Sequence, residues 1–224
     1  MPKKIIFMGT PMFAVPILKS LYQNGYPIST VYTQSPKKSH RGQKINKSPI
    51  QGIAETLNLE FRSPETLKNN DEEFQFIKNM NADLAIVVAY GQIIPKEYLN
   101  LTKKGFINIH GSILPKWRGA APIQRAIMNG DNKIGVSIMK IEEKLDSGPV
   151  LLFKEIELNQ SITHGEIEKE LSVLGADLLF EGIKIIKSGS FKFVNQTHSK
   201  ATYAKKIDKI ETKINWNLDA NKVL

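Results

Sequence analysis

The chain has 224 residues, of which 41% are hydrophobic and 24% are charged, and its formal net charge is +9. This composition is typical of a globular protein, and the length allows one large domain or two small ones. The absence of Cys excludes disulfides, thiolate nucleophiles and cysteine-based zinc sites. No apolar run reaches the length of a membrane span, and the start MPKKIIFMGTP does not have the pattern of a signal peptide, so the sequence predicts a cytoplasmic protein without membrane contact.

The positive charge is concentrated near the N-terminus. No Asp or Glu occurs up to Ala54, whereas eight Lys and Arg residues do, and the remainder is close to neutral. Five of the eight lie in QSPKKSHRGQKINKSPI, residues 34–50, which we expect to be a mobile basic loop. Such a loop suits a nucleic-acid backbone because each neutralised phosphate releases counterions, although a solvated loop without a partner has the same composition. The cations expected to bind nucleic acid are Lys37, Lys38, Arg41 and Lys44.

Hydrophobic periodicity predicts alternating strands and helices in the first half of the chain. The nearly continuous apolar run ADLAIVVAYG is typical of a central strand in a parallel sheet. Ser48 followed by Pro49 is a candidate helix start. The predicted strands are 3–9, 28–34 and 82–91, and the predicted helices are 11–25, 48–58 and 71–81.

The second half continues the alternation. Thr163 and Glu166 predict a capping box at the start of a long helix that ends before Gly189. The elements together predict an α/β fold with an open, mostly parallel, doubly wound sheet, in which ligands bind beyond the carboxyl ends of the strands. The predicted strands are 105–111, 134–142 and 149–158, and the predicted helices are 121–130 and 163–187.

Asn108 and His110 are the leading candidates for a functional role. In GFINIHG they share one face of a strand, while Ile107 and Ile109 share the other and are expected to enter the core. An amide beside an imidazole suits an oxyanion that forms when an amine attacks an acyl or formyl carbon. A purely structural His at the end of a strand would give the same local pattern.

The turn KLDSG supplies a carboxylate, Asp146, which either holds His110 and helps it to pass a proton or serves only the turn. His40, His164 and His198 are interpreted as surface residues, and no pair of histidines has metal-ligand spacing, so no metal site is expected. The hydrolase motif GxSxG is absent, and FMGTPMFA has one Gly where a dinucleotide fingerprint needs three. The residues alone predict an acyl-group site and a nucleic-acid contact on an α/β fold.

Several stretches resemble the formyltransferases that use 10-formyltetrahydrofolate. NIHGSILPKWRGAAPIQRAI and LDSG carry the resemblance, which extends through IIFMGTPMFA, the TQ before the basic loop, VVAYG and KINWNLDA. These stretches occur in family order over essentially the whole chain. Within that family they are most similar to the methionyl-tRNA formyltransferases, and the fold implied is the Rossmann-like formyltransferase fold.

The resemblance implies a catalytic trio, a folate site and a tRNA contact. The trio is Asn108, His110 and Asp146, and Arg41 matches the arginine that approaches the tRNA acceptor end. We expect two stretches to border the folate, the tetrad SILP and the stretch VVAYG. The tetrad has Ile where the family has Leu. These residues are Ser112, Ile113, Leu114 and Pro115 of the tetrad, and Val88, Ala89, Tyr90 and Gly91 of VVAYG.

The implied activity is transfer of the formyl group of 10-formyltetrahydrofolate to the α-amine of methionyl-initiator tRNA, for translation initiation. Asn108 and His110 are expected to stabilise the oxyanion while Asp146 orients His110, without a metal, in a monomeric protein. Relatives continue after WNLDA into a smaller β-barrel domain, which we expect to be absent here. The predicted organisation is a catalytic domain at 1–190, with 191–224 forming the domain edge and the start of a linker.

Other functions remain open at this point. An enzyme that formylates an amino sugar on a nucleotide carrier shares the fold and the trio, but it needs no Lys-rich loop and usually differs from AAPIQRAI. A glycinamide ribonucleotide formyltransferase shares the trio but matches less of the flanking sequence. A formate-releasing hydrolase would carry an added regulatory domain, and a missing barrel also allows a truncated, non-catalytic tRNA-binding remnant.

Overall fold

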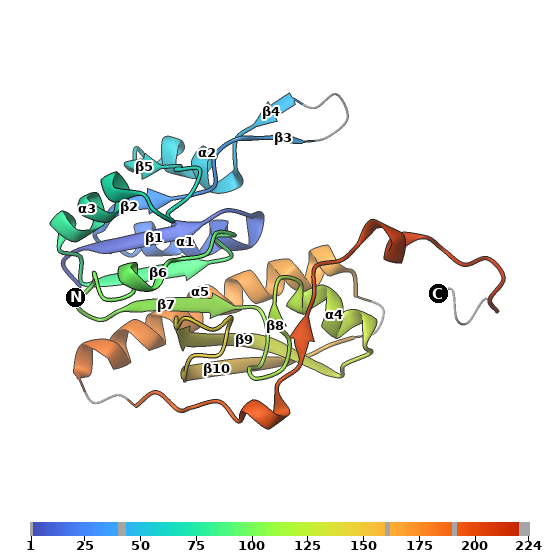
Figure 1. Ribbon diagram of the computed structural model, residues 1–224. Coiled ribbons are helices and arrows are strands. Elements are labelled where there is room, and N and C mark those ends of the chain that lie inside the picture. The colour runs from blue at the N-terminus through green and yellow to red at the C-terminus, as the bar shows by residue number, and fades with distance from the viewer. Residues whose placement is uncertain (1, 40–43, 160–161, 190–191, 220–224) are drawn as a thin grey trace.

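The computed structural model describes residues 2–39, 44–159, 162–189 and 192–219, and it contains a seven-stranded sheet in the order β10-β9-β7-β6-β1-β2-β5 (Figure 1). Strands β5, β2, β1, β6 and β7 run parallel, while β9 is antiparallel to β7 and β10 is antiparallel to β9. The predicted mostly parallel α/β fold is therefore confirmed. The strands are β1 (Ile5–Gly9), β2 (Ile28–Tyr32), β5 (Phe61–Arg62), β6 (Leu84–Val88), β7 (Phe106–His110), β9 (Lys133–Lys140) and β10 (Val150–Glu157).

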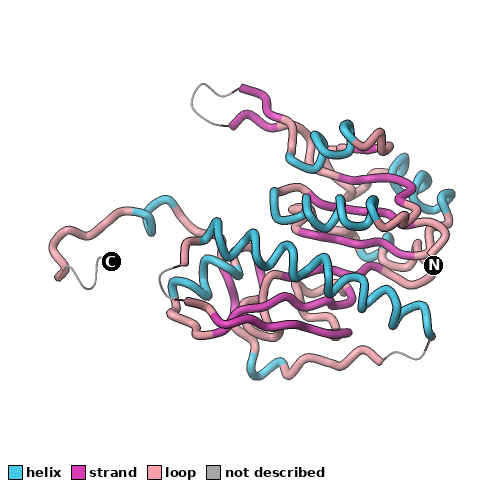
Figure 2. The backbone as a smooth tube through the Cα atoms, turned by 180° about the vertical axis from the view of Figure 1, so that it is seen from behind, coloured by secondary structure: helices cyan, strands magenta, loops and turns pink. Residues whose placement is uncertain are grey.

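Helices cover both faces of the sheet, and the longest packs against β9 and β10 on one face (Figure 2). Their starts and ends follow the predicted signals. The Ser48 hydroxyl accepts a hydrogen bond from the Gln51 amide at 2.9 Å, and the capping box of Thr163 and Glu166 is present. The helices are α1 (Val15–Gln23), α2 (Pro49–Thr56), α3 (Asp71–Met80), α4 (Pro122–Met128) and α5 (His164–Ser188), with 3-10 turns η1 (Met12–Ala14), η2 (Lys96–Tyr98), η3 (His198–Lys200) and η4 (Lys209–Thr212).

Alternation along the central strands divides the core into two layers. Ile5 and Phe7 of β1 belong to the cluster that includes buried residues of α1 and α5, whereas Ile6 and Met8 belong to the cluster on the opposite face, which includes Ile77 of α3. Successive side chains of a strand point to opposite faces, so a strand buried on both faces must be apolar throughout. This arrangement fixes the register that brings polar side chains to the carboxyl ends of the strands.

The second layer contains a buried ionic cluster around Glu73. Its carboxylate accepts a hydrogen bond from the Tyr32 hydroxyl at 2.6 Å and three from Arg62. Arg62 also lies over the ring of Phe76, 4.2 Å from its centroid. Burial and the bond to Glu73 raise the pKa of Tyr32 well above its usual value. The cluster therefore satisfies a carboxylate that would be costly to bury alone.

The basic segment 34–50 differs from the expected loop. It forms a short antiparallel hairpin of β3 (Lys37–Ser39) and β4 (Lys44–Asn46), which extends beyond the sheet near α2 (Figure 1). Antiparallel neighbours can pair through their backbones across a short connection, so a hairpin needs no apolar run. The backbones of Lys37, Lys38 and Lys44 lie in these strands, and Arg41 lies outside the described residues.

A second short pairing joins two distant parts of the chain. Strand β8 (Arg118–Gly119) pairs in parallel with β11 (Tyr203–Ala204), and the Arg118 amide donates to the carbonyl of Thr202 at 2.9 Å. Residues 192–204 thereby run from the end of α5 back to the carboxyl end of the sheet (Figure 1). The domain boundary at residue 190 stays a prediction. Within the described part of the chain, no helix combines the length and apolarity needed to cross a membrane.

Candidate active site

Strand β7 carries Asn108 and His110 to the carboxyl end of the sheet. Asn108 pairs with Val87 of β6, and His110 pairs with Ser137 of β9, so both lie between two neighbouring strands. Ile107 and Ile109 of the same strand are in the main core, as the alternation predicts. Asn108 is half-buried and His110 is 6% exposed. The predicted pair is therefore held in a largely desolvated position.

The imidazole of His110 is fixed by a backbone carbonyl. Its Nε2 lies 2.8 Å from the carbonyl oxygen of Trp117. A carbonyl can only accept a hydrogen bond, so Nε2 carries the hydrogen, and in the neutral ring Nδ1 has a free lone pair. Nδ1 lies 3.8 Å from Oδ2 of Asp146. Because Nε2 is hydrogen-bonded to Trp117, Nδ1 is the nitrogen available for proton transfer. The positive charge that a proton at Nδ1 creates would lie beside the Asp146 carboxylate.

Asp146 completes the group from the turn between β9 and β10. Its Oδ2 accepts a hydrogen bond from the Gly119 amide at 2.8 Å, and the Asn108 Nδ2 is 3.5 Å from its Oδ1. The three predicted residues are thus brought together. The carbonyl of Trp117 makes the hydrogen bond to Nε2 of His110, while Asp146 lies at ion-pair distance from Nδ1, and the orienting role expected of Asp146 stays a prediction.

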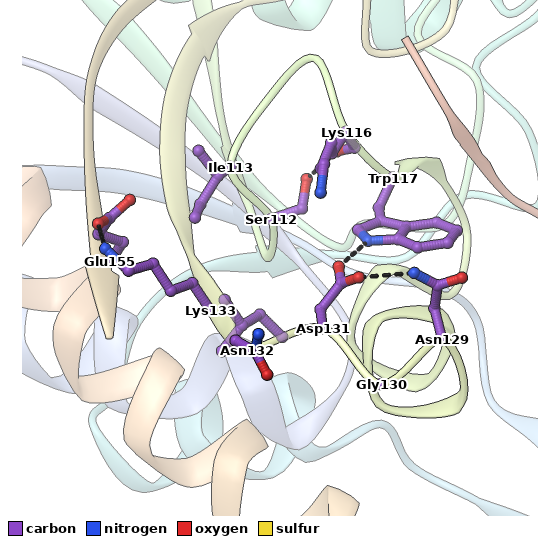
Figure 3. A pocket seen from close by; sticks show the side chains of 11 residues that line it. Ser112, Ile113, Lys116, Trp117, Asn129, Gly130, Asp131, Asn132, Lys133 and Glu155 are labelled. Atoms are coloured by element: carbon purple, nitrogen blue, oxygen red, sulfur yellow. Dashed lines mark hydrogen bonds and ion pairs between the residues drawn. The ribbon is translucent and has the colours of Figure 1, made fainter. Parts of the chain in front are cut away.

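The backbone of Trp117 is held in an uncommon conformation. Its φ is 60°, in the left-handed region that costs a non-glycine residue about 1–2 kcal/mol. Two bonds hold it there, one from its amide to the Thr202 hydroxyl at 2.9 Å and one from its indole Nε1 to Oδ2 of Asp131 at 2.7 Å (Figure 3). The strain is thus maintained by contacts that also aim the carbonyl at His110.

The predicted folate tetrad forms a tightly bonded loop after β7. Ser112 is buried, and its hydroxyl donates to the carbonyl of Lys116 at 2.6 Å. The Ser137 hydroxyl donates to the Ser112 carbonyl at 2.7 Å and accepts from the amide of Leu114 at 3.1 Å. Leu114 is also buried, while Ile113 and Pro115 are half-buried. Contact of these residues with folate stays a prediction.

A hollow of about 490 Å³ borders the same loop (Figure 3). Neither Asn108, His110 nor Asp146 lines it, so it is not the space in which that trio would act. Among its charged groups, Asp131 accepts from Trp117 and Lys133 contacts Glu155. The lining residues are Ser112, Ile113, Lys116, Trp117, Asn129, Gly130, Asp131, Asn132, Lys133, Ile134 and Glu155.

The predicted segment Val88–Gly91 presents mainly backbone. The side chains of Val88 and Tyr90 are buried in opposite core layers, and burial raises the pKa of the Tyr90 hydroxyl. Ala89 and Gly91 are exposed and have φ values of 47° and 80°. Since β6 is adjacent to β7, this exposed backbone lies next to the trio and allows a planar ligand to approach closely.

Sequence reasoning did not identify Trp117, Thr202 or Gln196 as part of this site. Trp117 acts through its backbone carbonyl, and Thr202 binds its amide from a distant segment. Gln196 lies in the same distant segment and donates to the carbonyl oxygen of Asp146 at 2.9 Å. None of these contacts leaves a local pattern. The signal available was Trp117 itself, a large aromatic residue in a turn between a strand and a helix. Among the residues that the structure describes, no three His, Cys, Asp or Glu side chains come together as metal ligands.

A family model and the relatives found by sequence comparison all point to formyltransferases. The family model described as formyl transferase matches residues 3–183. The chain is 58% identical over 224 residues to the methionyl-tRNA formyltransferase of Pelagibacter ubique, covering 100% of this chain and 72% of the relative. It is 44% identical to the methionyl-tRNA formyltransferase of Mesorhizobium japonicum, covering 100% of this chain and 70% of the relative.

Solved structures share the fold at lower identity. The sugar 3N-formyltransferase WlaRD superposes with a TM-score of 0.72 at 21% identity, covering 98% of this chain and 76% of that chain. Phosphoribosylglycinamide formyltransferase from Streptococcus pneumoniae superposes with a TM-score of 0.67 at 20% identity, covering 84% of this chain and 99% of that chain. At these identities the likeness concerns the fold alone.

Proposed function

The chain belongs to the methionyl-tRNA formyltransferase family, and we propose that it transfers a formyl group to the α-amine of methionine on initiator tRNA through Asn108, His110 and Asp146. The observation that carries the proposal is the convergence of these three side chains at the carboxyl end of β7, with a free His110 Nδ1 facing the carboxylate. The formyl donor of this family is 10-formyltetrahydrofolate, which acts as a co-substrate.

In the proposed reaction the α-amine attacks the formyl carbon, and the formyl oxygen becomes negatively charged. Asn108 directs its amide at this oxygen, since only one of the two Nδ2 hydrogens can face Asp146. His110 accepts the proton that the attacking amine loses, at Nδ1, and returns it to the departing nitrogen. Asp146 stabilises the imidazolium that forms in between. The site is largely desolvated, which strengthens each of these interactions.

The folate-facing groups in this proposal are the exposed backbone of Ala89 and Gly91 and the loop that follows β7. Two features support a folate site at this backbone, namely the left-handed conformation of both residues and the adjacency of β6 and β7. Ala89 has little side chain to obstruct a flat ring. Gly91 has none, and a side chain there would require Gln34 to move, because a Cβ at Gly91 would lie 2.1 Å from Nε2 of Gln34. The donor would place its reactive carbon near the trio when it is bound.

The β3–β4 hairpin is proposed to contact the tRNA backbone. Its support is the concentration of Lys37, Lys38 and Lys44 on a hairpin that extends away from the sheet (Figure 1). Arg41 belongs to the same proposal through its sequence alone. Phosphate contacts supply affinity that falls as salt concentration rises.

The test of the reaction is single-turnover formylation of methionyl-initiator tRNA by wild-type protein and by His110→Ala, with 10-formyltetrahydrofolate in excess. His164→Ala, which changes a partly exposed histidine at the start of α5, is the matched control. Removing His110 should lower the rate by roughly 10²- to 10³-fold while the control keeps it. A near-normal rate for His110→Ala, or formylation of an amino-sugar nucleotide or glycinamide ribonucleotide in place of the tRNA, would contradict the proposal.

The tRNA contact is tested by the salt dependence of binding. Replacing Lys37, Lys38 and Lys44 by Gln should make the slope of log affinity against log salt shallower by roughly one unit for each phosphate that the variant no longer neutralises. A control with Gln at the exposed lysines 68, 78 and 184 should keep the wild-type slope. Equal slopes in all three proteins would mean that the hairpin lysines do not touch phosphate.

A further inference from the structure

Gln196 is a buried amide in the segment that follows α5. It is 7% exposed, although its neighbours Asn195 and Thr197 are exposed. Its Nε2 donates to the carbonyl oxygen of Asp146 at 2.9 Å and to that of Gly148 at 2.7 Å. Gln196 thus spans 50 residues of sequence to hold the backbone of the turn that carries the Asp146 carboxylate.

The orientation of this amide is determined by Arg118. Nε and Nη2 of Arg118 donate to Oε1 of Gln196 at 3.0 and 2.7 Å, and Nη2 is 3.1 Å from Nδ1 of His198. A guanidinium can only donate and the carbonyls of Asp146 and Gly148 can only accept, so the amide cannot be flipped without losing all four bonds. Arg118 is 3% exposed, and within the described chain no carboxylate lies within ion-pair distance of it.

The turn needs such a hold because its conformation is restricted. Asp146 has φ 44°, and a Cβ at Gly148 would lie 1.9 Å from the carbonyl oxygen of Lys140. The direction of the carboxylate follows from this backbone. Its Oδ2 accepts from the Gly119 amide and lies 3.8 Å from the His110 ring. A small rotation of the turn would therefore change the distance between the Asp146 carboxylate and the His110 imidazole.

We propose that Gln196 is a positioning residue, which with Arg118 fixes the Asp146 turn so that the carboxylate faces Nδ1 of His110. The inference rests on the proposed function, because it assigns Gln196 a role through Asp146. Gln196 itself contacts none of the reacting atoms. Its contribution is to reduce the range of positions open to a carboxylate whose distance from the imidazole determines how well the proton is held.

A merely structural role would give a different pattern of kinetics. If Gln196 only attached the segment 192–198 to the sheet, its removal would lower stability and would affect wild-type and Asp146 variants equally. If it acts through Asp146, its effect must vanish once the carboxylate is gone. Energies of residues that act as one unit are not additive, so a double-mutant cycle separates the two roles.

The experiment compares kcat, KM and thermal stability for Gln196→Ala, Asp146→Asn and the double variant, with Asn195→Ala as the matched control in the same segment. Gln196→Ala should lower kcat roughly 10- to 100-fold with KM for both substrates within about twofold. In the Asp146→Asn background the same change should lower kcat less than about twofold. The control should match wild type. An unchanged kcat for Gln196→Ala, or full additivity with Asp146→Asn, would overturn the proposal.

Gln196→Glu keeps the test decisive if the alanine variant does not fold. Glutamate keeps an oxygen acceptor for Arg118 and adds an ion pair, but it removes both donors to the turn. The expected result is a folded protein with the kcat loss of Gln196→Ala. A folded Gln196→Glu protein with wild-type kcat would overturn the proposal. Should Asp146→Asn itself keep the wild-type rate, the role of Asp146 in the proposed function fails, which is a separate and recognisable outcome.

Discussion

Replacing Trp117 by Phe tests whether the backbone carbonyl at this position controls His110. The substitution keeps an aromatic ring but removes the bond from the indole Nε1 to Asp131 (Figure 3). A hydrogen bond to a charged group contributes about 1.5–3 kcal/mol, and the left-handed backbone at Trp117 costs about 1–2 kcal/mol. Because the two are similar in size, loss of the bond should let the backbone relax and move the carbonyl away from His110.

The expected net loss of stability is about 0.5–1 kcal/mol, which is the bond energy less the strain that is released. Urea unfolding measures this loss. Nitrogen NMR distinguishes the two tautomers of an imidazole. In the wild-type protein the neutral ring of His110 should carry its hydrogen on Nε2. Trp117→Phe should give a mixture of tautomers and a roughly tenfold lower kcat. Trp216→Phe, at a side chain that is 78% exposed, is the control. A single wild-type tautomer and unchanged kcat in folded Trp117→Phe would refute the reasoning.

Three further predictions concern the core and the site. Glu73→Gln should lower the free energy of unfolding by about 2–3 kcal/mol in urea, because the buried cluster loses its charge-assisted bonds while the bond to Tyr32 weakens; no loss would mean that the cluster is not stabilising. Burial raises the pKa of Tyr98 from 10.0 to about 12, so its contribution to the free energy of unfolding should be fully present below pH 10.0 and should be lost as the pH rises towards 12. Unfolding followed by circular dichroism at each pH measures this loss, and a free energy that does not change with pH would contradict the prediction. Gly119→Ala should lower kcat with little change in KM, since a Cβ there would lie 2.8 Å from a backbone oxygen and displace the amide that binds Asp146; wild-type kcat would show that this amide is dispensable.

Local periodicity was sufficient to predict the five α-helices in the described part of the chain and six of the seven strands of its main sheet, but not the two-residue edge strand β5. The apolar alternation of β7 predicted which face Asn108 and His110 would occupy, and the Thr163 capping box predicted the start of α5. In each case the signal lies within a few residues of the feature. The basic hairpin was not predicted, because antiparallel pairing of a polar segment depends on backbone bonds that side-chain pattern does not report.

The supporting shell of the site could not be predicted from such patterns. The Trp117 amide and the Thr202 hydroxyl are 85 residues apart, and β8 and β11 are each only two residues long. Gln196 lies in a polar stretch that resembles many exposed segments. Long-range pairs of this kind depend on the closed fold, so the sequence predicted the chemical groups but not the contacts that orient them.

The position of these contacts explains why the site can keep an unfavourable backbone. Ala89 and Trp117 have left-handed conformations that a non-glycine residue adopts only when its surroundings impose them. The Trp117 amide donates to Thr202, and the Thr10 hydroxyl donates to the carbonyl of Tyr90, the residue that follows Ala89, so a distant segment binds the backbone at or next to each of them. Losing one such bond removes little of the core and therefore leaves the protein folded. The strained segment relaxes all the same, so the geometry of the site is more sensitive than the fold to changes in residues that never touch a substrate.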